Sequence, residues 1–143
     1  MADALDRRIQ ETVANGRGYT LVLLWKGPLR DQPEAEADRL QQEHLRHLFT
    51  LRNEGRLLLN GPVLDDGDLA VIGIFAGQDR DAVRAVAEAD PSVEAGRLRV
   101  DVRPCSASPV TRSEFGGSGT RRRIQPGCGS NTITGMARSV FRW

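Results

Sequence analysis

The sequence predicts an α+β fold in which two helices cover one face of a four-stranded, mostly antiparallel sheet. The predicted segments follow the order strand, helix, strand, strand, helix, strand, which is that of the ferredoxin-like βαββαβ arrangement. Residues 19–25 form a continuous apolar run, as in a strand covered on both faces. Residues 97–103 alternate between polar and apolar, as in a strand with one buried face. Helices on one side leave the other sheet face open, so we expect a homodimer packed sheet to sheet.

The first half of the chain contains the longest predicted helix. Residues 2–14 have the composition of a short helix and precede the break "NGRG". The first strand, "YTLVLLW" at 19–25, is stopped by "KGP". A helix is predicted from about Glu34 to Asn53 because this segment is rich in Ala, Leu, Glu, Gln and Arg, and Gly55 suits its C-terminal end.

The second half predicts a hairpin, a helix and the last strand. The segments "RLLLNGP" at 56–62 and "LAVIGIF" at 69–75 read as strands, and "DDGD" at 65–68 has the composition of a turn between them. Residues 79–90 are predicted to form an amphipathic helix that Pro91 terminates. The alternating segment described above then completes the sheet.

Composition divides the chain into three parts. We assign residues 1–18 to an N-terminal extension, 19–104 to the α+β domain and 105–143 to a tail rich in Gly, Ser and Arg. The net charge of +1 is unevenly distributed: residues 1–104 carry −4 and residues 105–143 carry +5. The last part has little helical or strand periodicity, so we predict that it is a disordered basic tail.

Several classes of protein are disfavoured. No apolar run approaches the roughly 20 residues of a membrane span, and the N-terminus lacks the apolar core of a secretion signal, so we expect a cytoplasmic protein. RNA-recognition domains share this element order but stack bases on strand aromatics, whereas the corresponding strand here offers only Phe75. We therefore expect no specific nucleic-acid binding and at most weak binding of polyanions by Arg121, Arg122 and Arg123.

His44 is the residue of the predicted core that most requires explanation. At 100° per residue it falls near the centre of the stripe formed by Leu40, Leu48 and Leu51, and His47 falls at the edge of that stripe. A buried imidazole needs hydrogen-bond partners. One interpretation is a core histidine bonded to a backbone carbonyl. The other is a functional histidine oriented by a carboxylate.

Asp90 is the candidate carboxylate. It continues the inward spacing of Val83 and Val86 on the second helix, and Pro91 biases it out of helical geometry. A solvated residue at a helix end would have the same pattern, so both interpretations stay open. The spacing of His44 and His47 differs from the His-Glu-x-x-His of zinc enzymes, and we predict no metal and no cofactor.

Two segments resemble the YciI-like, or YCII-related, domain family. "HLRHLFTLRNEGRLLLNGP" has the spacing H-L-x-x-L-x-x-L-x-x-E-G-R-L-L-x-x-G-P, and "ADPSVEAGRLRVDVRP" is similar to the family's D-P-x-x-x-A-G stretch. The resemblance covers about residues 19–104. It implies a ferredoxin-like fold that forms a dimeric α/β barrel, with a proposed His–Asp pair in a cleft. The family histidine falls on His44 and the family aspartate on Asp90.

The resemblance leads to two functional hypotheses. In the first, the chain is a cofactor-independent enzyme that isomerises, dehalogenates or eliminates from a small metabolite. His44 would act as the general acid/base and Asp90 would orient it. In the second, the chain is a noncatalytic ligand-binding or dimerisation module and the pair is a structural contact. The chain departs from the family pattern at Ser92 and Cys105, which stand where aromatic residues are common, and Ser92 suggests an altered or roomier pocket wall.

Overall fold

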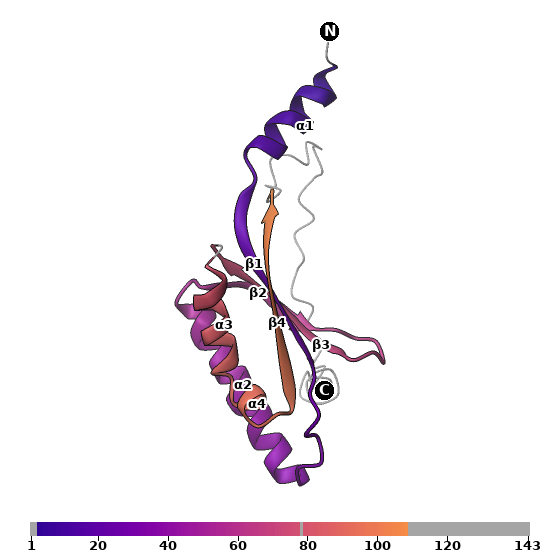
Figure 1. Ribbon diagram of the computed structural model, residues 1–143, viewed down its shortest axis with the longest axis vertical. Helices are drawn as coiled ribbons and strands as arrows, with labels where there is room; N and C mark the ends of the chain where they lie inside the picture. Colours follow the sequence, from indigo (N-terminus) through magenta and orange to yellow (C-terminus); the bar gives the residue numbers. More distant parts are fainter. Residues whose placement is uncertain (1–2, 78, 109–143) are drawn as a thin grey trace, which may run out of the picture.

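The computed structural model describes residues 3–77 and 79–108 (Figure 1). The elements are, in chain order, α1 (Ala4–Ala14), β1 (Arg17–Lys26), α2 (Glu34–Asn53), β2 (Leu57–Pro62), β3 (Leu69–Ala76), α3 (Arg80–Glu88), α4 (Pro91–Glu94) and β4 (Leu98–Ala107). The bounds of α2 are those predicted from composition and the glycine stop. Within these ranges, no helix is both long enough and apolar enough to cross a membrane.

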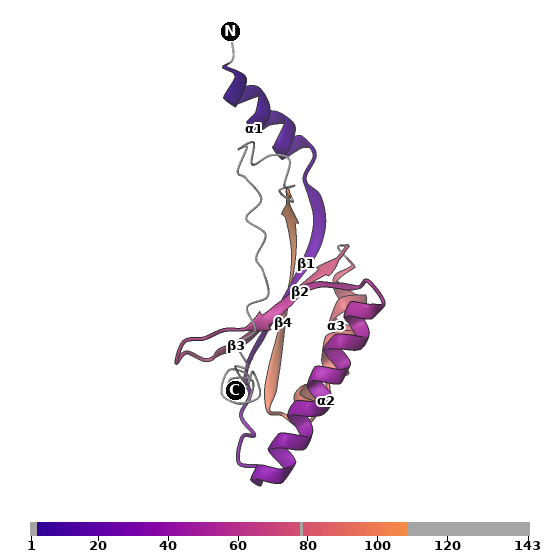
Figure 2. The same cartoon turned by 180° about the vertical axis from the view of Figure 1, so that it is seen from behind.

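The four strands form one antiparallel sheet in the order β2-β3-β1-β4. This is the ferredoxin-like order, with β1 in the middle and the predicted β2–β3 hairpin at one edge. The helices α2, α3 and α4 all lie on the same side of the sheet, as the two opposite views show (Figures 1 and 2). The predicted fold class is therefore confirmed.

The hydrophobic core lies between this helix layer and the sheet. The side chains of β1 alternate, so that Val22 and Leu24 are buried beneath the helices whereas their neighbours face the other side. The remaining core residues come from every other element of the domain except α4: Leu48, Leu51, Leu57, Ala70, Val71, Phe75, Val83, Ala87, Leu98 and Val102. Burial of this apolar surface is the main stabilising contribution to the fold.

The central strand pair is longer than the sequence predicted. Arg17 pairs with Ala107 at one end of the β1–β4 ladder and Lys26 pairs with Leu98 at the other. β4 therefore continues past residue 104, where the predicted α+β domain ends, because Cys105 pairs with Tyr19. The polar residues beside Cys105 are compatible with a strand because they are exposed. The rest of the predicted disordered tail, residues 109–143, lies outside the described residues.

The second predicted helix ends two residues earlier than expected and is followed by a further short helix. α3 ends at Glu88 and Asp90 is extended, with φ −64° and ψ 127°. Pro91 then begins the short helix α4 at its first position, where its missing N–H costs nothing and its fixed φ suits a helix. Pro91 thus starts a new helix as well as preventing the first one from continuing.

The sheet face opposite the helices is apolar along its centre. Leu21, Leu23 and Trp25 of β1 point to this side, next to Ile72 and Ile74 of β3, and all five are half-buried. Along β4 the same face carries charged residues, including an ion pair between Asp101 and Arg103 at 3.0 Å. Within the described residues no helix covers this face (Figure 2). α1 extends beyond one end of the sheet and buries none of its residues.

Candidate functional site

α2 places His44 on the inner side of the helix. Its side chain is 1% exposed, and Leu40, Leu48 and Leu51 on the same stripe are also buried. The angular prediction for His44 is therefore confirmed. His47, predicted at the edge of the stripe, is partly buried.

Asp90 reaches the same region from the connection between α3 and α4. It is the N-cap of α4, and its Oδ1 accepts a hydrogen bond of 2.9 Å from the backbone N–H of Ser92. An aspartate is among the preferred N-caps because its carboxylate accepts one of the otherwise unbonded N–H groups of the first turn. The backbone therefore fixes one carboxylate oxygen and leaves Oδ2 available.

The structure brings the two predicted site residues into contact although they are 46 residues apart in the sequence. His44 Nδ1 lies within hydrogen-bond distance of Asp90 Oδ2, and both side chains are almost fully buried. A carboxylate only accepts hydrogen bonds, so Nδ1 is the donor. In the neutral ring, Nε2 then carries the lone pair. The interpretation of Asp90 as a solvated residue at a helix end is wrong, because the residue is 1% exposed.

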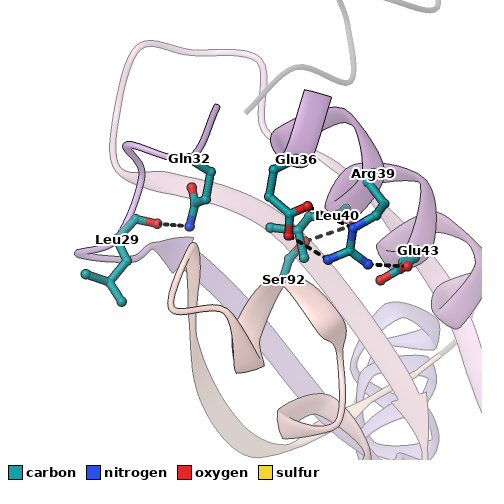
Figure 3. Close-up of polar contacts among 7 residues, drawn as sticks. All are labelled: Leu29, Gln32, Glu36, Arg39, Leu40, Glu43 and Ser92. Carbon is teal, nitrogen blue, oxygen red and sulfur yellow. Dashed lines mark hydrogen bonds and ion pairs between the residues drawn. The ribbon is translucent and has the colours of Figure 1, made fainter. Parts of the chain in front are cut away.

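Two further polar contacts join α2 to the segment around Asp90. The hydroxyl of Ser92 donates to the carbonyl of Leu40 at 3.2 Å, a contact that Figure 3 shows. The Nε2 of His47 donates to the carbonyl of Val86 on α3 at 2.9 Å. His47 thus makes a backbone-carbonyl contact of the kind that was weighed for His44.

A small cavity lies beside the pair, between α2 and the sheet. Its volume is about 20 Å³, which is enough for roughly one water molecule. Asp90, His47 and Asn60 are its polar lining residues, and the rest of its wall is mainly aliphatic side chains together with Phe75. The cavity is therefore too small for a metabolite in this conformation.

Charged side chains lie on surfaces around the site. On the outer side of α2, Arg39 bonds Glu36 at 2.6 Å and Glu43 at 2.5 Å (Figure 3). The bond from Arg39 holds the pKa of the Glu36 carboxyl below its usual value. On the open sheet face, the bond from Arg103 lowers the pKa of Asp101. Both pairs join an exposed arginine to a partly exposed carboxyl, so they contribute little to stability.

The two histidines do not form a shared ligand set in this conformation. His44 contacts Asp90 and His47 contacts a backbone carbonyl. Across residues 3–77 and 79–108, no three His, Cys, Asp or Glu side chains are grouped closely enough to hold a metal ion.

The family assignment rests on a direct match. The model of the YCII-related domain matches residues 21–106, which is more than half of the chain, and the chain belongs to this family. The match spans β1 to β4 and includes both His44 and Asp90. No curated protein matches the chain.

Two solved structures are similar in fold. One is the 5-chloro-2-hydroxyhydroquinone dehydrochlorinase of Burkholderia phenoliruptrix in complex with 2,5-dihydroxybenzoquinone. It is 23% identical with a TM-score of 0.39, and the similarity covers 58% of this chain and 90% of the enzyme. The other is a dimeric protein of unknown function with a ferredoxin-like fold from Bacteroides fragilis. It is 14% identical with a TM-score of 0.37, over 64% of this chain and 96% of that one.

Sequence reasoning missed the part that Ser92 plays in this site. In the sequence the residue stands out only as a departure from the family pattern at a pocket wall. In the structure its backbone bonds Asp90 and its side chain bonds Leu40, so it is a structural neighbour of the pair. The order Asp-Pro-Ser is a usable signal, because an aspartate before a proline is typical of an N-cap followed by the first helical residue.

Proposed function

We propose that this protein is a small-molecule enzyme in which His44 and Asp90 carry out general acid/base chemistry without a cofactor. The reaction class is isomerisation, elimination or dehalogenation of a small metabolite. The observation that carries the proposal is the buried contact between His44 Nδ1 and Asp90 Oδ2. The backbone bond from Ser92 holds the carboxylate, and the carboxylate holds the ring, which is the arrangement that orients a catalytic imidazole.

The roles of the two residues follow from their hydrogen bonds. With Nδ1–H donating to Asp90, the lone pair of Nε2 accepts a proton from a substrate carbon or hydroxyl. The Asp90 carboxylate stabilises the imidazolium that forms. The same Nε2–H then returns its proton to another substrate atom, or to the group that leaves. Such a positioned histidine typically accelerates a reaction by about 10²- to 10⁴-fold.

Proton exchange with solvent tests this proposal while the substrate is still unidentified. The protein is incubated in D₂O with a panel of small metabolites that have acidic C–H groups, and deuterium incorporation is followed by NMR and mass spectrometry. We expect at least one compound to exchange or react, and His44→Gln to slow it by about 10²- to 10⁴-fold. Equal rates for the wild type and His44→Gln would contradict the role of His44.

The second candidate function is a noncatalytic ligand-binding or dimerisation module. One observation favours it: the pair is enclosed, and it joins α2 to α4 as a structural contact would. In this case compounds from the same panel would bind, as seen in ligand-observed NMR, without deuterium exchange or turnover. The stability measurements in the Discussion separate the two candidates further.

We also propose that the open sheet face forms a homodimer. Its apolar centre, which includes Leu23 on the middle strand, is the kind of surface that is normally covered by a partner. Since this face lies opposite the core, Leu23→Glu should leave the protomer folded and shift it from dimer to monomer. Sedimentation or light scattering measures the mass, and circular dichroism checks the fold.

A matched control separates the effect of position from that of added charge. Phe49 is 56% exposed on α2, in the helix layer on the other side of the sheet, so Phe49→Glu also replaces a large apolar side chain by a carboxylate but away from the face. We expect Phe49→Glu to keep the mass of the wild type. A monomeric wild type, or a Leu23→Glu variant that remains dimeric, would contradict the proposed interface.

A further inference from the structure

Ser92 forms two buried hydrogen bonds that connect the His44–Asp90 pair to α2. The residue is 1% exposed and lies in the first turn of α4. Its backbone N–H donates to Asp90 Oδ1 at 2.9 Å, and its hydroxyl donates to the Leu40 carbonyl at 3.2 Å. Figure 3 shows the Ser92 side chain directed at the Leu40 turn of α2. One residue therefore bonds both the carboxylate and the opposite helix.

These bonds close a ring of contacts through His44. Leu40 lies one turn before His44 on α2, and in an α-helix the carbonyl of residue 40 also accepts the N–H of residue 44. The ring runs from Leu40 to Ser92, from Ser92 to Asp90, from Asp90 to His44, and back along α2. α4 has only four residues, and its own backbone hydrogen bonds, from the N–H groups of Val93 and Glu94 to the Asp90 carbonyl, do not reach α2.

We propose that the Ser92 hydroxyl is a positioning group for the His44–Asp90 pair. By bonding the Leu40 carbonyl, it fixes where the first turn of α4 lies against α2. It thereby sets the distance and angle at which Asp90 Oδ2 meets His44 Nδ1. This role rests on the proposed acid/base function, which requires the ring to be held in one orientation. Small displacements of a catalytic group are costly, since about 1 Å can reduce a rate by about 100-fold.

Ser92→Ala is the direct test, because it removes the hydroxyl and keeps the backbone N–H that bonds Asp90. We expect the downfield proton resonance of His44 Nδ1–H to shift or broaden. With a substrate identified, we expect kcat to fall by about 10-fold or more while KM changes little. Ser92→Thr keeps a hydroxyl and should restore the resonance. If Ser92→Ala does not fold, Ser92→Cys replaces it. The thiol has a similar volume but is a weaker donor, so the His44 Nδ1–H resonance should again shift or broaden relative to the wild type.

The chain offers a matched control in Thr20. Its side chain is fully buried, and its hydroxyl donates to the Gly77 carbonyl at 2.8 Å, outside the contact between α2 and α4. Thr20→Val thus removes a buried hydroxyl bonded to a backbone carbonyl, as Ser92→Ala does. We expect both variants to melt at lower temperature, and only Ser92→Ala to change the His44 resonance.

The outcomes distinguish this proposal from the proposed function. If Ser92→Ala lowers the melting temperature but leaves the His44 resonance as in Thr20→Val, the hydroxyl is only a structural contact and the positioning role is wrong. If the resonance changes but no compound of the panel reacts with the wild type, the positioning of the pair stands and the catalytic function fails. A change in both the resonance and kcat supports both.

Discussion

We expect Asp90→Asn to keep the protein folded and to lower turnover by about 10²- to 10⁴-fold, because it reverses the hydrogen bond to His44. The asparagine Oδ1 still accepts from the Ser92 N–H, so the cap of α4 is retained. The amide nitrogen then replaces Oδ2 and donates toward His44 Nδ1. The ring must accept at Nδ1 and carry its proton on Nε2, which removes the lone pair that the proposed mechanism uses.

Two measurements check this expectation. The ¹⁵N chemical shifts of the His44 ring report the tautomer, and kinetics with a compound found in the deuterium screen report the rate. Asp79→Asn is a matched control, since Asp79 caps α3 by accepting from the Ala82 N–H at 3.0 Å and lies outside the pair. We expect this control to keep both tautomer and rate. An Asp90→Asn variant with the rate of the wild type would contradict the mechanism.

The largest effect on stability is expected from His44→Leu. This change leaves the Asp90 carboxylate buried without its ring partner, and breaking a buried pair on one side typically costs about 3–5 kcal/mol. Urea denaturation measures the free energy of unfolding. An m-value equal to that of the wild type shows that the variant unfolds between the same two states, so the two free energies can be compared. The protein should remain folded in water if its stability lies in the ordinary range of about 5–15 kcal/mol.

A double-mutant cycle shows whether the pair is kept for stability. Asp90→Ser retains an oxygen that can cap α4 while removing the carboxylate. We expect His44→Leu with Asp90→Ser to be less destabilised than the sum of the single changes, with a coupling of about 0.5–3 kcal/mol. Recovery to near wild-type stability means that the fold does not need the pair, which favours the catalytic function. A double variant that stays far less stable than the wild type would instead favour the structural module, and strictly additive losses would mean that the two side chains do not interact.

Much of the fold could be predicted because its signals are local. The composition of residues 34–53 and the glycine that follows indicate the bounds of α2, and the apolar runs indicate the strands and the β2–β3 hairpin. The ends of β1 and β4 could not be predicted in this way. Arg17 belongs to a strand because it pairs with Ala107, and Cys105 because it pairs with Tyr19. Such pairing depends on residues far apart in the chain.

The site could be predicted in part, where its signals are also local. Helical periodicity alone placed His44 on the inner face of α2, because the angle between residues 40, 44 and 48 is fixed by helix geometry. For Asp90, the inward spacing with Val83 and Val86 and the family resemblance indicated the residue, and the following proline indicated an extended backbone. The bond from His47 to Val86 and the ring of contacts through Ser92 could not be foreseen. They depend on how two helices approach each other.

The sequence by itself therefore determined the order of elements, the face of α2 that is buried and the family to which the chain belongs. Periodicity and turn residues act over a few positions, so they can be read without knowing the rest of the molecule. The resemblance implied a pair of His44 and Asp90, but only the tertiary structure decided which atoms meet across 46 residues and that Ser92 joins the pair to α2. The physical reason is that hydrogen-bond partners of buried groups are chosen by packing, which brings distant segments to within about 3 Å of each other.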